Sequence, residues 1–422
     1  MAPNWLTDPS HRAWLRDHAI DLLAFGRRTG RPGGGAYWLR DDGLPDPTRP
    51  LFTWMTTRTV HVYGIGMLLG VPGCTAVAAA ALDGLLPVRA DGSPGRLHDA
   101  EHGGWYTEVE LAVDADEDTR GQPAPGKSCY DHVFVLLAGA TASHAGLDGG
   151  PELLTAATDV FLGRFWDEDA GRCVDTWDTA FTELDPYRGL NANMHAVEAL
   201  LSVASLTGDR AWLERADRIS RFVVDQSAAN GWRIPEHYGP DWVADLSLNR
   251  DRPADRFKPY GSTVGHSFEW ARLLVHLANA PIDADRTGLV DAARSLYRRA
   301  AADGWAPDGE PGFVYTVDWD GTPVVRDRLW WVLAEAIAAA AVLHRQTGEE
   351  AYAADYRRWW DHAAVHHIEP GNGSWRHQLD ATNQPDTTVW AGKSDLYHVF
   401  QAALIPTRPR WPMLAAAIAA GP

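Results

Sequence analysis

The chain has 422 residues, of which 45% are hydrophobic and 22% charged, a composition typical of a folded globular protein and not of a disordered or fibrous one. With 38 lysines and arginines against 56 aspartates and glutamates, the net charge is −18, so nucleic acid and anionic membrane surfaces are not expected as partners. Three cysteines without a C-x-x-C pair, and an N-terminus without an apolar signal stretch, predict a reducing, cytoplasmic compartment.

The chain contains six copies of a repeat about 60 to 73 residues long. Each copy is marked by a glycine beside or close to an aromatic residue, at Gly35, Gly104, Gly171, Gly231, Gly304 and Gly373. Between these marks the same segments return in the same order: an apolar helix rich in small residues, a very short connection, an amphipathic helix and a long loop. The copies nearly fill the chain, so the repeat describes the whole molecule.

Two kinds of helix are expected to alternate. The segments 133–142, 190–206 and 329–343 are apolar on most sides and rich in alanine, which predicts helices buried all round. The segment 212–223 has apolar residues at helical spacing on one face and charged residues on the other, which predicts a half-buried helix. The most apolar window, residues 333–343, contains Glu335 and is far shorter than the roughly 20 residues that cross a bilayer, so no membrane span is expected.

Six buried helices that alternate with six half-buried helices close most simply into an (α/α)6 barrel, an inner ring surrounded by an outer ring. We therefore expect an all-α fold and a single domain over residues 1–422. The connections from inner to outer helices are short, as at 70–72 and 207–209, whereas the long loops lead into the N-termini of the inner helices. One face of the barrel thus collects the loops and the positive helix ends, and we expect the functional site there.

Polar side chains recur at the first turns of the inner helices. Taking one per helix, they are Arg58, His132, His195, His266, Arg328 and His398. A single buried histidine is usually a hydrogen-bonded core residue, but several at one height in successive helices converge on one end of a central cavity. Because imidazoles titrate near neutral pH and can accept and return a proton, the pattern indicates a proton-transfer enzyme.

Two of these histidines have a glutamate three residues later on the same helical face, Glu198 after His195 and Glu269 after His266. A carboxylate at this spacing can orient an imidazole and raise its basicity. The same spacing occurs in metal sites of helical bundles, but no third and fourth carboxylates accompany the pairs, so no metal is expected. The polar stretch 98–102 is expected to be a solvated loop. No phosphate-binding or nucleophile-elbow motif is present, so neither a nucleotide cofactor nor serine hydrolysis is expected.

Several stretches give the chain a resemblance to a known family. They are Thr57-Arg58-Thr59-Val60-His61-Val62-Tyr63, Asn191-Ala192-Asn193-Met194-His195-Ala196-Val197-Glu198-Ala199, Gly265-His266-Ser267-Phe268-Glu269-Trp270, Asp395-Leu396-Tyr397-His398 and the run 303–321. Together they resemble the N-acylglucosamine 2-epimerase superfamily over essentially the entire chain. The most similar branch is that of the bacterial D-mannose isomerases and sulfoquinovose isomerases.

The resemblance implies an (α/α)6 barrel and an aldose–ketose isomerase that needs no cofactor and no metal. The implied substrate is a monosaccharide, D-mannose converted to D-fructose, with D-lyxose and D-xylulose as a further pair. A proton would pass from C2 to C1 through a cis-enediol. The implied catalytic residues are His266 and His398, with Glu269 supporting His266. The implied sugar-binding residues and pocket walls are Arg58, Asn191, His195, Arg256, Trp54, Trp331 and Trp390.

Other functions stay open at this point. A sulfoquinovose isomerase needs cations for a sulfonate, and Arg256, Lys258 and Lys393 are available. A sugar 2-epimerase would return the proton to the opposite face of C2. A glycoside hydrolase on this fold needs two opposed carboxylates, whereas the expected inward positions are mainly histidine. A sugar-binding protein without activity does not require several titrating imidazoles.

Overall fold

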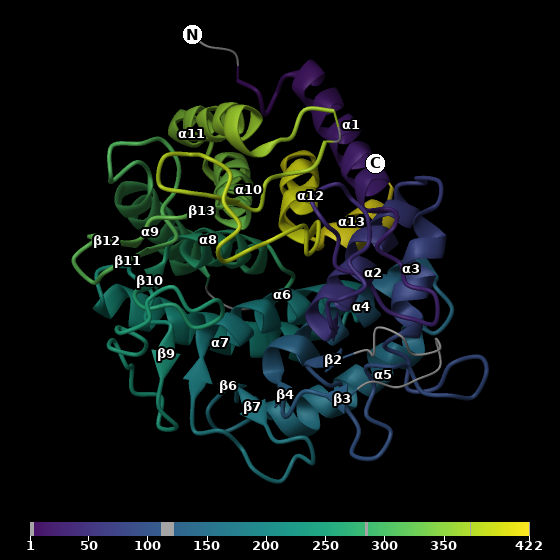
Figure 1. The fold of residues 1–422 in the computed structure, drawn as a ribbon. Helices are drawn as coiled ribbons and strands as arrows, with labels where there is room; N and C mark the ends of the chain where they lie inside the picture. The colour runs from purple at the N-terminus through teal and green to yellow at the C-terminus, as the bar shows by residue number, and fades with distance from the viewer. Residues whose placement is uncertain (1–3, 111–121, 283–285, 372, 422) are drawn as a thin grey trace. The chain divides into compact units, whose positions relative to one another are not determined.

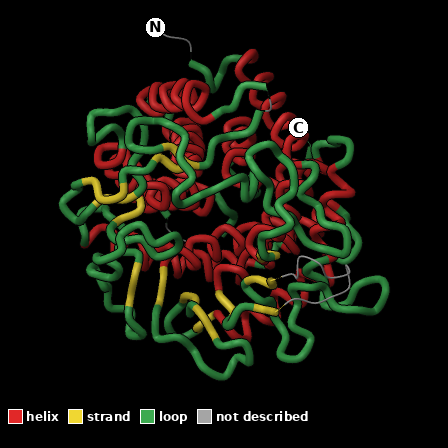
Figure 2. Tube along the Cα trace, viewed as in Figure 1, coloured by secondary structure: helices red, strands yellow, loops and turns green. Residues whose placement is uncertain are grey.

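The computed structural model describes residues 4–110, 122–282, 286–371 and 373–421, and helices make up most of its regular structure (Figures 1 and 2). The chain divides into two compact units. Unit 1 consists of Met1–Leu22, Ile219–Ala391 and His398–Pro412, and unit 2 consists of Leu23–Arg218, Gly392–Tyr397 and Met413–Pro422. Because each unit combines several stretches of chain, residues far apart in the sequence share one core.

Unit 2 consists of paired helices joined by loops with very short strands. Its helices are α2 (Thr53–Leu68), α3 (Cys74–Asp83), α4 (Cys129–Ala145), α5 (Gly150–Val160), α6 (Leu190–Thr207) and α13 (Leu414–Ala419). Its strands are β1 (Leu51–Phe52), β2 (Glu108–Glu110), β3 (Gln122–Pro123), β4 (Lys127–Ser128), β5 (Trp166–Asp167), β6 (Arg172–Cys173), β7 (Thr176–Trp177) and β8 (Arg188–Gly189). Helix α4 packs between α2 and α6, α3 covers α2, α5 covers α4, and α13 contacts α2, α4 and α6.

Unit 1 repeats this pairing. Its helices are α8 (Val264–Ala278), α9 (Thr287–Gly304), α10 (Trp330–Thr347), α11 (Glu350–His362), most of α1 (Pro9–Gly26) and most of α12 (Tyr397–Leu404). Its strands are β9 (His237–Tyr238), β10 (Ser262–Thr263), β11 (Thr316–Val317), β12 (Pro323–Val325), β13 (Arg328–Leu329) and β14 (Gln378–Leu379). Helices α8 and α10 pack together, α9 covers α8 and α11 covers α10. Helix α7 (Arg210–Ala229) runs from unit 2 into unit 1.

The buried helices lie where the apolar segments predict them. The segment 190–206 lies within α6, 133–142 lies within α4, and 329–343 corresponds to α10, whose residues Trp330–Leu343 are all buried. The amphipathic segment 212–223 lies within α7. Among the described residues, no helix is both long and apolar enough to cross a bilayer.

The short connections depend on glycine at helix ends. Gly208 ends α6 and Gly348 ends α10, each in the left-handed conformation with φ of 71° and 73°. A side chain there would be strained, so glycine is the residue that lets the chain turn directly into the next helix. Thr207-Gly208-Asp209 therefore forms the tight inner-to-outer connection that the repeat predicts.

The long loops contain short strands that the sequence analysis did not predict. Strands β4, β10 and β13 lead directly into α4, α8 and α10, and they pair antiparallel with β7, β11 and β14. In the second of these pairs Ser262 lies opposite Val317 and Thr263 opposite Thr316. Each pairing fixes the N-terminus of a buried helix, which is the turn that carries the predicted functional side chains.

Candidate active site

His266 lies in the first turn of α8, in unit 1, and is 8% exposed. Its Nδ1 is 3.0 Å from Oε1 of Glu236, a buried residue just before β9. A carboxylate only accepts hydrogen bonds, so Nδ1 carries the proton and Nε2 remains the basic nitrogen. Glu269, which was predicted to support His266, does not make this contact. It accepts instead from Nη2 of Arg272, at 3.4 Å. The i,i+3 spacing shares a helical face, but the carboxylate that reaches the ring comes from a loop.

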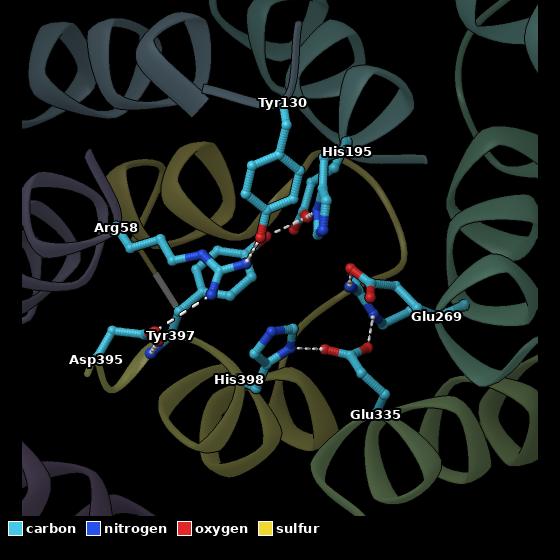
Figure 3. A network of polar contacts seen from close by, with 10 residues as sticks. Arg58, Tyr130, His195, Glu269, Glu335, Asp395, Tyr397 and His398 are labelled. Atoms are coloured by element: carbon cyan, nitrogen blue, oxygen red, sulfur yellow. Dashed lines mark hydrogen bonds and ion pairs between the residues drawn. The ribbon is translucent and has the colours of Figure 1, made fainter. Parts of the chain in front are cut away.

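His398 belongs to a buried cluster of charged residues in the same unit (Figure 3). It lies in α12, and its Nδ1 is 2.8 Å from Oε1 of Glu335 in α10. Oε2 of Glu335 accepts from Nε of Arg272 at 2.9 Å, and Arg272 also contacts Glu269. Glu269, Arg272 and Glu335 are each at most 1% exposed. The geometry again places the proton on Nδ1 and leaves Nε2 as the base.

Both imidazoles lie against one indole. The ring of Trp331 has its centroid 5.3 Å from that of His266 and 5.7 Å from that of His398, tilted by 36° and 37°. The backbone of Gly265 allows this approach, because a Cβ at that position would lie 2.2 Å from Cζ3 of Trp331. The predicted catalytic histidines and one predicted pocket wall are thus brought together within unit 1.

Three side chains of this cluster could in principle bind a metal ion. One ligand atom each from Glu269, Glu335 and His398 lie within 4.8 Å of one another. Arg272, however, donates to both carboxylates. Its guanidinium supplies the positive charge that a metal ion would otherwise bring, so the donor set fits an arginine-centred network better than a cation site.

Arg58, in α2 of unit 2, is a buried and firmly held cation (Figure 3). Its Nη1 donates to Oδ2 of Asp395 at 3.2 Å, and its Nη2 donates to the hydroxyl of Tyr130 at 2.8 Å. The rings of Phe134 and Tyr397 lie 4.5 and 4.8 Å from the guanidinium carbon. A guanidinium oriented in this way is suited to bind sugar oxygens or a developing negative charge.

His195, in α6 of unit 2, is enclosed by aromatic rings. The rings of Phe134 and Tyr130 lie 4.6 and 5.3 Å away, centroid to centroid. Its Nδ1 is 3.9 Å from Oε2 of Glu198, which is beyond hydrogen-bond distance. Glu198 accepts instead from the hydroxyl of Tyr397. Here too the i,i+3 glutamate is an electrostatic neighbour of the imidazole and not its hydrogen-bond partner.

The remaining predicted sugar-binding residues occupy both units. In unit 2, Oδ1 of Asn191 is buried without a hydrogen-bond partner among the described residues, and the ring of Trp54 lies 5.2 Å from the guanidinium of Arg58. In unit 1, the guanidinium of Arg256 lies 4.7 Å from the ring of Trp390 and donates to the neighbouring backbone carbonyl at 2.6 Å. The guanidinium of Arg256 and the ring of Trp390 therefore lie next to each other within unit 1.

Two polar residues of the predicted ring have structural roles instead. Nδ1 of His132 donates to the carbonyl oxygen of Ser128 at 2.7 Å, and its Nε2 accepts from the N–H of Trp105 at 3.0 Å. Burial lowers the pKa of His132 to about 3. Arg328 is buried and donates to Oδ1 of Asp308 at 2.7 Å. Neither side chain is available for proton transfer, so the expectation that all six converge on the site is wrong for these two.

The polar stretch 98–102 is exposed at Ala100, Glu101 and His102, as a solvated loop predicts, but Asp99 is buried. Asp99 is 1% exposed, and its Oδ2 is 2.8 Å from Nζ of the buried Lys127. Burial acts to raise the pKa of Asp99, but hydrogen bonds from Lys127, Glu101 and His102 outweigh it and lower the pKa to about 2. The stretch is a loop fixed by a buried ion pair.

The carboxylates that accept from the two imidazoles, Glu236 and Glu335, were not predicted from the sequence. Glu236 lies in a loop, where no periodicity marks it. Glu335 did carry a signal, since it is the one charged residue in the buried part of α10, Trp330–Leu343. A charge inside such a helix is costly unless it is paired, so it points to a buried partner. Arg272, three residues after Glu269, is that partner.

Known proteins resemble this chain over nearly its whole length. The profile of the family described as N-acylglucosamine 2-epimerase (GlcNAc 2-epimerase) matches residues 34–402. A D-mannose isomerase of Thermobifida fusca is 46% identical over 418 residues, 98% of each chain. A D-mannose isomerase of Pseudomonas cannabina pv. alisalensis is 39% identical, over 99% of this chain and 97% of that one. The crystal structure of a D-mannose isomerase aligns with a TM-score of 0.83 at 26% identity, over 95% of this chain and 99% of that one.

These similarities confirm the fold class, an all-α (α/α)6 barrel, that the six-fold repeat predicts. They also agree with the family resemblance that the short stretches suggest over essentially the entire chain. On this evidence the chain belongs to the N-acylglucosamine 2-epimerase family.

Proposed function

We propose that this protein is an aldose–ketose isomerase that interconverts D-mannose and D-fructose. One observation carries the proposal: His266 and His398 each have a carboxylate at Nδ1, and both lie against Trp331. Two Nε2 atoms that can give or take a proton are thereby held close to one aromatic wall. The names of the relatives from T. fusca and P. cannabina favour mannose as the aldose. D-Lyxose, which lacks only the sixth carbon of mannose, is a further substrate, with D-xylulose as its product.

The reaction requires balanced proton transfers on the opened sugar. Nε2 of His398 takes the proton from C2 while His266, which begins the cycle as the imidazolium, gives its Nε2 proton to O1, and a cis-enediol forms. His398 then returns its proton to C1 while His266 takes the proton of the O2 hydroxyl, which leaves the ketose. The enzyme ends in its starting protonation state. Such positioned acid–base groups each contribute about 10² to 10⁴-fold to the rate.

We assign the sugar-binding roles on the family resemblance. Arg58 would stabilise negative charge on the enediol oxygens, an effect worth a few kcal/mol for a well-placed donor. His195, Arg256 and Asn191 would bind hydroxyls. The pocket walls would be Trp54, Trp331 and Trp390. The unpartnered Oδ1 of Asn191 supports its assignment, because a buried acceptor without a donor is costly until a ligand hydroxyl fills it.

The charge network argues for proton transfer without a metal and against a glycosidase. Arg272 already balances the carboxylates of Glu269 and Glu335, while Glu236 is engaged by His266. A glycoside hydrolase needs one carboxylic acid and one carboxylate that face the glycosidic oxygen and the anomeric carbon. The carboxylates in this part of unit 1 are instead held by imidazole or guanidinium groups.

One assay tests the function. The purified chain is incubated with mannose, fructose, lyxose, glucose and sulfoquinovose in excess chelator, in D₂O, and products are followed by NMR. We expect fructose from mannose, with deuterium at C1 of the ketose and no loss of rate in chelator. Glucose as the main early product would indicate a 2-epimerase, and turnover of sulfoquinovose alone would indicate the sulfonated sugar. Loss of activity in chelator with no deuterium at C1 would overturn the proton-transfer mechanism.

Two variants test the catalytic assignment. We expect His398→Ala and His266→Ala each to lower kcat by at least about 10²-fold. The half-exposed His366, which follows α11 and has no role in the site, provides the control, and His366→Ala should keep the parent rate. If deuterium exchange at C1 survives in His398→Ala but is lost in His266→Ala, the roles of the two histidines are exchanged.

The three cysteines support the expected reducing, cytoplasmic compartment. Cys74, Cys129 and Cys173 are all buried and none forms a disulfide. Burial raises the pKa of the Cys74 thiol to about 11, so it stays protonated and unreactive at neutral pH. The fold therefore does not depend on an oxidising environment.

A further inference from the structure

A cavity of about 430 Å³ lies in unit 1 at the C-terminal end of α10, away from the candidate active site. Trp331 is in the first turn of this helix, whereas His344 and Arg345, which line the cavity, are in its last turn. At about 1.5 Å of rise per residue, the two ends are about 20 Å apart along the helix axis. The proposed sugar-binding residues therefore do not explain this cavity, which we call the α10 cavity.

Three arginines gather at the α10 cavity. Arg12, in α1, and Arg345 line it. Arg410, which follows α12, lies beside them, and its Nη1 donates to the carbonyl oxygen of Arg345 at 2.5 Å. Burial and the like charges of Arg410 and Arg12 lower the pKa of Arg345. Because a guanidinium keeps its proton at neutral pH, three positive charges are held together here.

The protein balances these charges only in part. Nη2 of Arg12 donates to the carbonyl oxygen of Leu6 at 3.1 Å, and Nη2 of Arg345 donates to that of Pro406 at 2.6 Å. Within the described ranges, no carboxylate forms an ion pair with Arg12, Arg345 or Arg410. The arginines reach the C-terminal ends of α8 and α10. A helix end carries the equivalent of about half a negative charge, so most of the positive charge remains unbalanced.

The walls of the α10 cavity strengthen the field of the arginines. Much of the lining is apolar, contributed by Leu6, Ala341 and Pro406. A concave site with apolar walls and charges of one sign concentrates the electric field inside it. One carboxylate approaches the lining, since Oε1 of Glu350 is 3.8 Å from Nε2 of His344. The side chain of Glu350 is 77% exposed, so water and salt screen its charge.

We propose that the α10 cavity binds a small molecule through a doubly charged oxyanion, a phosphate group, held by Arg12 and Arg345. Both residues are exposed, so a ligand can reach them. Among the described residues, Nη1 of Arg12 and Nε of Arg345 donate to no protein acceptor, which leaves these N–H groups for ligand oxygens. The cavity has room for more than the anion, because small-molecule pockets occupy about 300 to 1,000 Å³. The inference concerns a second site and does not depend on which sugar is isomerised.

Binding of inorganic phosphate to the full chain tests the site. Calorimetric titration and the melting temperature are measured with sodium phosphate at pH 7.5, where the ion is mainly doubly charged, and with sodium chloride at equal ionic strength. We expect a saturable binding isotherm and a rise in Tm with phosphate, because a ligand that binds the folded chain and not the unfolded chain stabilises it. Monobutyl phosphate is the second probe. Tighter binding of this ester would indicate that the apolar wall contacts the organic part, whereas equal affinities would indicate that the phosphate group alone is recognised.

Variants of the two lining arginines locate the bound phosphate. Arg12→Gln and Arg345→Gln each remove one positive charge and should raise the Kd for phosphate about tenfold or more. Arg345→Lys keeps the charge but not the bonds to carbonyl oxygens, and it should retain more of the affinity than Arg345→Gln. The matched control is Arg16→Gln, one turn after Arg12 in α1, whose side chain is 74% exposed and 3.3 Å from Asp17. It should bind phosphate as the parent does.

Three results would overturn the inference. The first is the lack of a saturable phosphate isotherm, and the second is an equal rise in Tm with chloride, which ordinary screening would explain. The third is parent affinity for phosphate in both Arg12→Gln and Arg345→Gln, since the anion would then bind elsewhere. If Arg345→Gln does not fold, Arg12→Gln decides alone, because its guanidinium bonds a carbonyl oxygen only six residues away.

Discussion

A measurement of stability can test whether His132 is a structural histidine that stays neutral in the folded protein. His132 occupies the same place in the repeat as His195 and His266, but its Nε2 accepts the backbone N–H of Trp105 at 3.0 Å and its Nδ1 donates to the Ser128 carbonyl oxygen at 2.7 Å. A nitrogen that accepts from a backbone N–H cannot hold a proton of its own. The folded protein therefore requires neutral His132, and burial lowers its pKa to about 3.

The size of the effect follows from this pKa. An unfolded chain takes up the proton near pH 6.5, whereas the folded chain does not do so until the pH approaches 3, so stability is present above pH 6.5 and is lost as the pH falls. His132 alone should cost about 1.4 kcal/mol of unfolding free energy at pH 5.5, and roughly 2.7 kcal/mol at pH 4.5.

The assay is urea unfolding of the parent and of His132→Asn at pH 7.5 and 5.5. The variant loses packing at both values, but its drop in unfolding free energy between them should be smaller than the parent's by about 1.4 kcal/mol. Asn193→Ala is the matched control, since it removes a buried, non-titrating side chain that bonds the Cys173 backbone at 2.8 and 3.1 Å. An equal pH dependence in parent and His132→Asn would refute the assignment of a neutral, structural imidazole.

Three further predictions concern the indole, the buried cation and the domain organisation. Gly265→Ala should displace Trp331 and raise KM for mannose about tenfold or more, as measured by steady-state kinetics. The control Gly288→Ala, whose Cβ would lie in open space, should leave the kinetics unchanged. Arg58→Lys should lower kcat/KM for mannose by about tenfold or more, because an ammonium cannot reproduce the two directed hydrogen bonds that the guanidinium makes. Unchanged kinetics would contradict the assignment of Arg58 to the sugar-binding site. The predicted single domain should melt in one calorimetric transition whose enthalpy equals the van't Hoff value, and two separate transitions would contradict it.

The parts of the fold that the sequence predicts are those encoded by periodicity. The apolar run of α10 and the amphipathic face of α7 follow from side-chain spacing, and the glycine after α6 follows from the conformation that a tight turn needs. The paired strands before α4, α8 and α10 were not predicted, because two-residue strands leave no alternation to detect. Their pairing depends on loop segments that are distant in the sequence.

The candidate site divides in the same way. His266 and His398 could be predicted because each occupies the first turn of a buried helix in a repeating frame. Glu236 could not, since it reaches His266 from a loop 30 residues earlier. The carboxylate at His266 is that of Glu236 and not that of the expected Glu269, which shows the limit of the i,i+3 rule. Residues at this spacing share a helical face, but a buried carboxylate accepts from the strongest donor within reach. For Glu269 the donor shown is Arg272.

Position in the repeat and hydrogen-bond partners thus carry different information about a histidine. The repeat brings His132 and His266 to equivalent turns of α4 and α8, yet backbone groups occupy both nitrogens of the first, whereas a carboxylate occupies only Nδ1 of the second. Backbone partners require the neutral ring, because an N–H donor opposes protonation, while a carboxylate partner favours the imidazolium. A side chain that must gain and lose a proton in every turnover needs a carboxylate partner at one nitrogen and a second nitrogen that is not bonded to a backbone N–H. His266 and His398 have a carboxylate at Nδ1, whereas both nitrogens of His132 bond the backbone.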